Sequence, residues 1–296
     1  MKIAAIDIGS NACRLLINDV IVNLDGKTDF IKLALVRVPL RLGFDVFEHG
    51  KIRAKKIEQL IQTIQAYKLL LTVYEVEHLK ACATSAMRDA ENAAEVLHLV
   101  EINTGIRIEV ITGDAEARFI YENHIAEALN NQESYLYIDV GGGSTELTFF
   151  SDGQLVFQHS FNIGTIRLLK DQVDKREWTK MQKFIEAKIR GHHHVTCIGS
   201  GGNINKIFSL SKRKEGKPLT LEMLRNYHNE FSRVSLQQRM QLYKLREDRA
   251  DVIAPALLIY INVMRWADAQ EIFVPKIGLA DGLIHNLYDE VTKREH

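Results

Sequence analysis

Apolar residues follow two spacings along this chain, and the two spacings predict different elements. Runs rich in Ile, Val and Leu and bounded by Gly or Asp are typical of strands, whereas apolar residues at every third or fourth position are typical of helices. Strands are predicted at residues 2–6, 14–22, 30–38, 78–83, 106–111, 135–140, 147–150, 154–160 and 195–199. Helices are predicted at 51–73, 90–100, from Asp114 as N-cap towards Leu129, and 178–189, with most of the remainder helical and 251–266 its most apolar part. Strands that alternate with helices predict an α/β protein.

One motif occurs in both halves of the chain. Asp7-Ile8-Gly9-Ser10 lies between two apolar strands, and Asp139-Val140-Gly141-Gly142 does the same, with the two aspartates 132 positions apart (139 − 7). This spacing is close to one domain length, and a chain of 296 residues suits about two domains. We therefore expect a lobe at 1–125 and another at 126–296, each with a glycine hairpin facing a shared cleft, and a break near 122–133. The last helix is a candidate to pack back on the first lobe.

Composition and charge argue against several classes of protein. Lys plus Arg and Asp plus Glu each total 38, so the net charge is zero, which argues against a nucleic-acid partner but allows an anionic substrate in a local pocket. The three cysteines contain no CxxC pair, so a reducing compartment is expected rather than a disulfide framework or zinc site. The longest uncharged apolar stretch, 252–264, contains Pro255 and Asn262 and is shorter than the ~20 residues of a membrane helix. We expect a cytoplasmic protein with no membrane partner.

The glycine-rich turns have the composition of anion-binding loops. Glycine lets successive backbone N–H groups approach a ligand without a Cβ in the way, and a preceding aspartate can hold a hard cation beside a phosphate. Ser10, Ser144 and Thr145 add hydroxyl donors. A plain β-turn explains the first hairpin equally well, but it explains the three consecutive glycines of the second less readily. A third loop, 199–203, follows a strand and opens a helix, so it is either a phosphate contact or a simple connecting turn.

Several charged residues allow both a structural and a functional interpretation. The position of Glu116 in the first turn of a helix favours a helix-dipole interaction over a role as general base. For Arg88 and Arg41 the alternatives are gripping a phosphate and lying in solvent. The basic stretch 206–217 is interpreted as a solvated loop, with a track for a long polyanion as the alternative. His192-His193-His194 is interpreted as an exposed connector, because adjacent side chains seldom converge on one metal ion.

A set of longer motifs runs in order through nearly the whole chain. They are Asp7-Ile8-Gly9-Ser10-Asn11, Ala83-Thr84-Ser85-Ala86-Met87-Arg88-Asp89, Gly113-Asp114-Ala115-Glu116-Ala117-Arg118, Asp139-Val140-Gly141-Gly142-Gly143-Ser144-Thr145-Glu146-Leu147, Gly199-Ser200-Gly201-Gly202, Arg246-Glu247-Asp248-Arg249-Ala250-Asp251 and Gly278-Leu279-Ala280-Asp281-Gly282-Leu283. With these motifs the chain resembles the exopolyphosphatase and guanosine pentaphosphate phosphohydrolase family, within the actin, Hsp70 and sugar-kinase superfamily. DVGGGSTEL together with ATSAMRDA is specific to that family, whereas DIGSN alone indicates only the superfamily.

The resemblance implies two ribonuclease-H-like lobes around a central cleft, as in actin-like ATPases. It also implies that the protein hydrolyses the terminal phosphate from a linear phosphoanhydride. It makes Glu116 the base for the attacking water, which reverses the positional interpretation. It also makes Asp139 and Glu146 catalytic residues that hold Mg²⁺ (or Mn²⁺) and the water, with Asp7 as a further metal contact. The phosphate-binding residues that it implies are Gly9, Ser10, Asn11, Arg41, Arg88, Gly141, Gly142, Gly143, Ser144, Thr145, Gly201 and Gly202, with Arg246 as a further candidate.

The chain departs from the family pattern at a few positions. Ala115 stands where the family often has the first of two glutamates, and Asn203 follows Gly202 where a threonine is usual. The sequence ends soon after Asp281, as expected of the short form, which has no additional helical domain. A homodimer is a candidate assembly for proteins of the short form.

The expected function is that of an exopolyphosphatase, which releases orthophosphate from the ends of polyphosphate with Mg²⁺. The alternative within the family converts guanosine pentaphosphate to tetraphosphate, and both reactions place the same terminal phosphate in the same clamp. A non-catalytic sensor of guanosine tetraphosphate or polyphosphate is a further alternative, against which Glu116, Asp139 and Glu146 argue. A sugar kinase is disfavoured because nothing marks an adenosine pocket or a sugar-binding aspartate.

Overall fold

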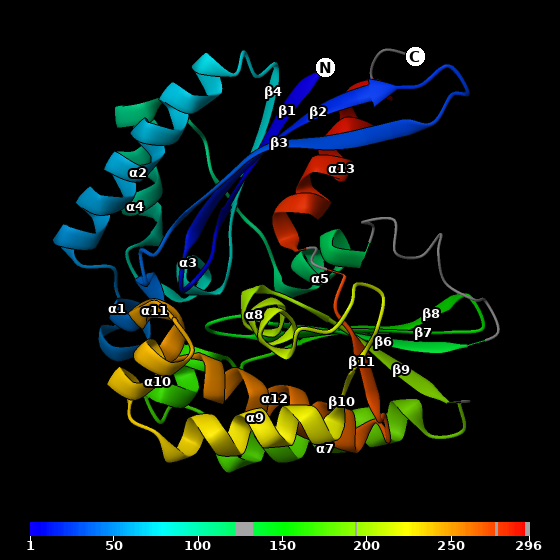
Figure 1. The fold of residues 1–296 in the computed structure, drawn as a ribbon. Coiled ribbons are helices and arrows are strands. Elements are labelled where there is room, and N and C mark those ends of the chain that lie inside the picture. The colour runs from blue at the N-terminus through cyan, green and yellow to red at the C-terminus, as the bar shows by residue number, and fades with distance from the viewer. Residues whose placement is uncertain (122–132, 193, 276–277, 294–296) are drawn as a thin grey trace. The chain divides into compact units, whose positions relative to one another are not determined.

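Two mixed β-sheets form the framework of the structure, each in its own unit (Figure 1). The computed structural model describes residues 1–121, 133–192, 194–275 and 278–293. The first unit comprises Met1–Asn123 and Leu279–His296, and the second comprises His124–Gly278. The predicted α/β class is confirmed. The break expected near 122–133 lies outside the described residues, apart from Glu133.

The first unit is a five-stranded sheet in the order β3-β2-β1-β4-β5, with helices on both faces. Its elements are β1 (Lys2–Ile8), β2 (Cys13–Val22), β3 (Thr28–Val38), α1 (Leu42–His49), α2 (Ala54–Val73), β4 (His78–Ala83), α3 (Ser85–Asp89), α4 (Ala93–Thr104), β5 (Glu109–Val110), α5 (Gly113–Tyr121) and α13 (Leu279–Thr292). The last helix, α13, packs Leu283 and Ile284 against Ile3, Ala5 and Leu16 on one face of the sheet. Helices α2 and α4 lie on the opposite face (Figure 1). The C-terminal helix therefore completes the core of the first unit.

The second unit is a six-stranded sheet in the order β10-β11-β9-β6-β7-β8. Its elements are β6 (Ser134–Val140), β7 (Thr145–Ser151), β8 (Gln154–Phe161), α6 (Thr165–Leu169), α7 (Lys175–Ile189), β9 (Val195–Ser200), α8 (Gly202–Ser211), β10 (Leu219–Thr220), α9 (Leu221–Arg233), α10 (Leu236–Leu242), α11 (Glu247–Ala250), α12 (Ile253–Trp266) and β11 (Glu271–Phe273). The most apolar predicted stretch forms α12, which is buried on most sides because α7, α8, α9 and β6 all contact it. In the described parts of the chain, no helix is both long and apolar enough to cross a membrane.

The two sheets contain equivalent hairpins. In β1–β2, Asp7 lies opposite Arg14, and in β6–β7, Asp139 lies opposite Glu146, so both pairs are related by 132 positions (139 − 7 and 146 − 14). The turns have the same bond, from Gly9 N to the Ala12 carbonyl at 3.0 Å and from Gly141 N to the Ser144 carbonyl at 2.9 Å. The sequence repeat is thus a repeat of hairpin geometry.

The remaining differences from the sequence prediction lie at short elements and helix ends. Helix α1 was not predicted, because it begins after Arg41 in a left-handed conformation (φ 57°) with no side-chain cap. The three-residue β11 interrupts a region expected to be helical, and the strand expected at 106–111 is only β5. Helix α5 begins earlier than expected, since Thr112 Oγ1 accepts from the N–H of Ala115 at 3.1 Å; Asp114 is therefore not the N-cap. The part of that helix expected beyond 121 lies outside the described residues.

Candidate active site

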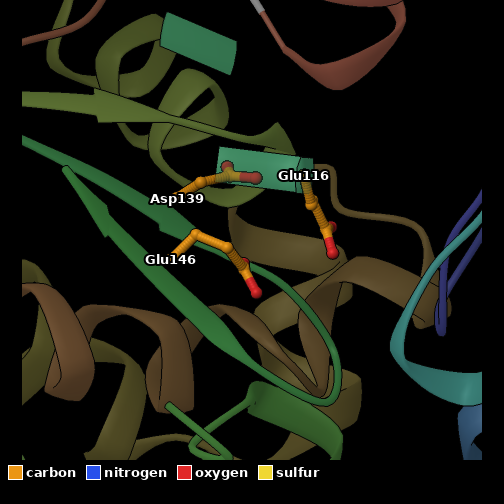
Figure 2. Close-up of side chains that lie close together, drawn as sticks. All are labelled: Glu116, Asp139 and Glu146. Atoms are coloured by element: carbon orange, nitrogen blue, oxygen red, sulfur yellow. The ribbon is translucent and has the colours of Figure 1, made fainter. Parts of the chain in front are cut away.

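Two carboxylates form the centre of the candidate site in the second unit. Asp139 on β6 and Glu146 on β7 are register partners, so their side chains leave the same face of the sheet (Figure 2). A carboxylate oxygen of one lies within 4.8 Å of one of the other. At an effective dielectric constant of about 20, two such charges repel by roughly 3–4 kcal/mol. A hard divalent cation relieves that repulsion, and carboxylate oxygens are the ligands that Mg²⁺ accepts.

Serines on the flanking strands hold both carboxylates. Ser200 on β9 donates from Oγ to Asp139 Oδ1 at 2.8 Å, and Ser160 on β8 donates from Oγ to Glu146 Oε1 at 2.9 Å. Register pairs Asp139 with Ser200 and Glu146 with Ser160, so the four side chains form one row across neighbouring strands. Neither serine was predicted as a site residue from the sequence. The row fixes the orientation of both carboxylates before any ligand binds.

The equivalent position in the first unit has a different charge balance. Asp7 is 2% exposed and accepts a hydrogen bond from the guanidinium of Arg14, its cross-strand partner. An ion pair therefore occupies the place that two carboxylates occupy in the second unit. The predicted metal contact of Asp7 stays a prediction, and its neutralisation by Arg14 argues for the second hairpin as the stronger cation site.

The triple-glycine loop is held by its carbonyl groups. The carbonyls of Gly141 and Gly142 accept from the N–H groups of Thr165 and Ile166 at 3.0 and 2.8 Å, and that of Gly143 accepts from Arg167 Nε at 2.7 Å. Within the described part of the chain, the N–H groups of Gly142 and Gly143 donate no hydrogen bond. The loop is thus held through its carbonyl oxygens, which accept hydrogen bonds from the start of α6. The N–H groups of Gly142 and Gly143 remain available as donors to an anion.

Gly164 permits the close approach of α6 to that loop. A Cβ at this position would lie 2.4 Å from both the Gly142 oxygen and the Gly143 carbonyl carbon. Gly164 was not predicted as a site residue, although a glycine just after a strand and before a helix is a recognisable signal of close backbone approach.

Changing Gly164 to alanine is expected to push α6 away from the loop. We expect a loss of roughly 1–3 kcal/mol of unfolding free energy, the usual effect of overpacking, and a raised KM for phosphate substrates. Thermal unfolding and steady-state kinetics measure both effects. Gly278→Ala is the matched control, because its Cβ would meet nothing within 4 Å. Wild-type stability and KM in Gly164→Ala would show that the close approach does not matter.

Thr145 supports the loop from inside the protein. Its side chain is fully buried, and Oγ1 donates to the Ile163 carbonyl at 2.6 Å, which joins the start of β7 to the segment before α6. Ser144 is also buried, at 2% exposure. The structure therefore gives the Thr145 hydroxyl a positioning contact, while its predicted contact with phosphate stays a prediction.

The third glycine loop packs directly on Asp139. Gly201 has φ 97°, and a Cβ there would lie 2.8 Å from Asp139 Oδ1, so only glycine suits the position. Tyr260 donates from its hydroxyl to the Ser200 carbonyl. Burial, and next the charge of Asp139, raise the pKa of Tyr260 well above its usual value, which keeps the hydroxyl protonated as a donor.

Arg249 on α11 contacts this loop and was not predicted as a site residue. Its Nη1 donates to Asn203 Oδ1 at 2.9 Å. A Cβ on Gly202 would lie 2.6 Å from this Nη1. Arg246, named instead from the same motif, has a side chain 62% exposed with Nε 3.4 Å from Asp248. Asn203, a departure from the family pattern, thus positions an arginine beside the start of α8.

The first unit contains a second carboxylate–arginine pair, formed by Glu116 and Arg88. Glu116 on α5 is buried, and Arg88 Nη1 donates to its Oε2 at 3.0 Å and to the Ile111 carbonyl at 2.9 Å. Arg88, predicted to grip phosphate, therefore holds the predicted base. Hydrogen bonding to a fixed cation keeps the Glu116 carboxylate in one orientation.

The first glycine hairpin also receives structural contacts. Ser10 Oγ and Ser85 Oγ are 2.7 Å apart and buried. The N–H of Arg41 donates to the Asn11 carbonyl at 3.0 Å, and the Arg41 guanidinium lies 3.9 Å from the centre of the Phe44 ring. The hairpin that starts at Gly9 is thus tied to α1 and α3, and its predicted phosphate contacts stay predictions.

The segment 192–194 and the three cysteines carry further reactive side chains. His194 is exposed, and the ring of His192 packs edge-on to Phe149, with ring centres 5.2 Å apart; the middle histidine of this segment lies outside the described residues. Burial raises the pKa values of the Cys13 and Cys197 thiols, and it raises the pKa of Cys82 to about 12. These thiols stay protonated near neutral pH, which argues against a cysteine nucleophile.

Sequence comparisons point to one protein family. The model of the Ppx/GppA phosphatase family matches residues 20–291. Exopolyphosphatase 1 of Mycobacterium bovis is 26% identical over 305 residues, which cover 96% of this chain and 87% of that protein. A bifunctional 3-dehydroquinate synthase/phosphatase of Fusobacterium nucleatum is 26% identical over 243 residues, which cover 81% of this chain. The chain spans 35% of that longer relative.

Structure comparisons agree with the sequence comparisons. A crystal structure of the Aquifex aeolicus member of the Ppx/GppA family has a TM-score of 0.75 and 28% identity, covering 100% of this chain and 99% of that one. An exopolyphosphatase from Cytophaga hutchinsonii has a TM-score of 0.81 and 20% identity, covering 98% of each chain, and this likeness concerns the fold alone. Together they confirm the predicted actin-like fold class.

Proposed function

Because the chain belongs to the Ppx/GppA phosphatase family and is thus a hydrolase of phosphoanhydride bonds, we propose that it removes the terminal phosphate of inorganic polyphosphate as orthophosphate. The observation that carries this proposal is the row of Asp139 and Glu146 beside a glycine loop with unused N–H donors. The similarity to Exopolyphosphatase 1 of Mycobacterium bovis supports polyphosphate as the substrate.

The residues of the second unit suit a hard divalent cation. Two buried or half-buried carboxylates lie within 4.8 Å, each oriented by a serine, and oxygen ligands of this kind fit Mg²⁺ or Mn²⁺. We assign Asp139 and Glu146 as the residues that hold it. When bound, the cation neutralises charge on the phosphate oxygens.

The side chains supply positioning and proton transfer. The N–H groups of Gly142 and Gly143 bind the oxygens of the terminal phosphate, and the first turn of α8 adds donors at the end of the third loop. Glu116, oriented by Arg88, accepts a proton from the attacking water. The water oxygen bonds to the terminal phosphorus as the bridging P–O bond breaks, and the shortened chain leaves with the bond electrons. Phosphoryl transfer of this type depends on alignment and charge stabilisation rather than on covalent catalysis.

Orthophosphate release tests this proposal. The purified chain is incubated with Mg²⁺ and with tripolyphosphate, long-chain polyphosphate or guanosine pentaphosphate in parallel. We expect release from both polyphosphates and loss of release on chelation. Release from guanosine pentaphosphate alone would replace the proposed substrate by the nucleotide. Tight binding with no release from any of the three would instead indicate a sensor.

The serines of the row are expected to tune the cation site. Ser160→Ala and Ser200→Ala each remove one hydrogen bond to a carboxylate that holds the cation. We expect the dissociation constant for Mn²⁺ to rise about 10–100-fold, the usual effect of losing a partner of a metal ligand. Ser134→Ala is the control, because Ser134 bonds Ser151 at the far end of the same strand pair. If all three variants bind Mn²⁺ equally well, the serines have no role in the site.

A further inference from the structure

The later part of α8 and the residues that follow it carry an unusual concentration of positive charge. Residues 206–217 contain five cations and one acid, Glu215, an excess of four (5 − 1) in a chain whose net charge is zero. Four of the cations, Lys212, Arg213, Lys214 and Lys217, are exposed. Among the described residues, the side chain of none of the five forms an ion pair or a hydrogen bond, although the backbone N–H of Arg213 donates to Ser211 Oγ at 3.3 Å. No acid in the described part of the chain forms an ion pair with these cations, so the segment keeps a local excess of positive charge that attracts anions. We call 212–217 the basic segment.

Helix α8 connects the candidate site to the basic segment. It starts at the third glycine loop, where Ser200 bonds Asp139, and its ten residues span about 15 Å before Lys212. Gly202, Lys206 and Ser209 are spaced by four and three residues, so they share one face of the helix. That face is partly or fully exposed, whereas Ile204, Ile207 and Phe208 on the other faces are buried. A polar stripe therefore runs from the glycine loop to the basic segment.

Given the proposed function, we propose that the stripe and the basic segment bind the distal phosphates of a long polyphosphate chain. The ligand class is a linear polyanion whose terminal phosphate lies at Asp139 and Glu146. Most of the cations are lysines, compact point charges on flexible stems that suit a repetitive chain better than a single planar group. Tripolyphosphate or a nucleotide with few phosphates keeps its charge near the site and does not extend along α8.

Charge removal in the basic segment tests the proposal. The variant Lys212→Gln/Arg213→Gln/Lys214→Gln/Lys217→Gln is compared with the wild type on long-chain polyphosphate and on tripolyphosphate at several salt concentrations. We expect the long-chain KM to rise at least about tenfold with kcat unchanged, because each contacted phosphate releases counterions. The slope of log affinity against log salt should fall by up to about 3, at about 0.7 for each lost contact. Tripolyphosphate kinetics should stay at wild-type values.

A charge-matched variant separates local binding from general attraction. Lys175→Gln/Lys180→Gln/Lys183→Gln/Lys188→Gln removes four exposed charges from α7 of the same unit. We expect its long-chain KM to match the wild type. An equal rise of the long-chain KM in both variants, or no rise in the basic-segment variant, would overturn this proposal. Hydrolysis of tripolyphosphate by the same variants would still support the proposed function. Absence of release from every polyphosphate by the wild type would overturn both.

Discussion

Glu116→Gln is expected to lower kcat for polyphosphate hydrolysis by about 10²–10⁴-fold, with little change in KM. The substitution keeps the size of the side chain but removes its ability to accept the proton of the attacking water. The Glu116 carboxylate is buried and accepts a hydrogen bond from Arg88 at 3.0 Å. Arg88 also donates to the Ile111 carbonyl, so the orientation of the carboxylate is fixed. The glycine loop of the second unit is untouched, which is why substrate binding should persist. Steady-state and single-turnover kinetics measure the two parameters separately.

An exposed glutamate provides the control for this variant. Glu101→Gln on α4 makes the same chemical change at an exposed position, and we expect wild-type kinetics. A Glu116→Gln enzyme with near-normal kcat would exclude Glu116 as the base. Glu116 would then only stabilise the start of α5, by ~0.3–1 kcal/mol through the interaction of its charge with the helix dipole.

Glu146→Gln is expected to reduce kcat/KM on the order of 10³-fold, equivalent to about 4 kcal/mol of transition-state stabilisation. The amide removes one of two paired negative charges, and with it most of the attraction for a divalent cation. Ser160 donates to Glu146 Oε1, a contact that an amide oxygen also accepts, so the sheet should stay folded. Activity measured across a wide range of Mg²⁺ concentrations shows whether part of the loss is recovered by more cation.

The matched control here is Glu222→Gln, an exposed glutamate in the first turn of α9. Its activity and Mg²⁺ dependence should equal those of the wild type. Full activity of Glu146→Gln at ordinary Mg²⁺ would mean that the carboxylate pair does not hold the catalytic cation.

The hairpin repeat could be predicted from the sequence because it depends on local pattern. An apolar strand, an aspartate and a glycine turn recur after 132 positions (139 − 7), and the structure repeats both the turn bond and the strand register. The same spacing also relates Arg14 to Glu146, and that exchange of charge distinguishes the ion pair of the first hairpin from the carboxylate pair of the second. The roles proposed for Glu116, Asp139 and Glu146 rest on family resemblance, since spacing alone favoured a structural role for Glu116.

Contacts between strands distant in sequence could not be predicted in the same way. Ser160 and Ser200 meet the carboxylates only because β8 and β9 flank β6 and β7 in register. Arg249 reaches the third glycine loop from a segment 46 residues further along the chain, at Asn203. Gly164 must lack a Cβ because the start of α6 lies directly against the glycine loop and donates hydrogen bonds to its carbonyl oxygens. Each of these depends on the order of strands or the docking of a helix, which local pattern does not specify.

Titration of the chain with Mn²⁺, followed by electron paramagnetic resonance, tests most directly whether the carboxylate pair is the cation site. We expect the wild type to bind Mn²⁺ and the double variant Asp139→Asn/Glu146→Gln to lose that binding, while thermal unfolding shows that the variant is folded. Equal Mn²⁺ affinity in the wild type and the folded double variant would contradict the account.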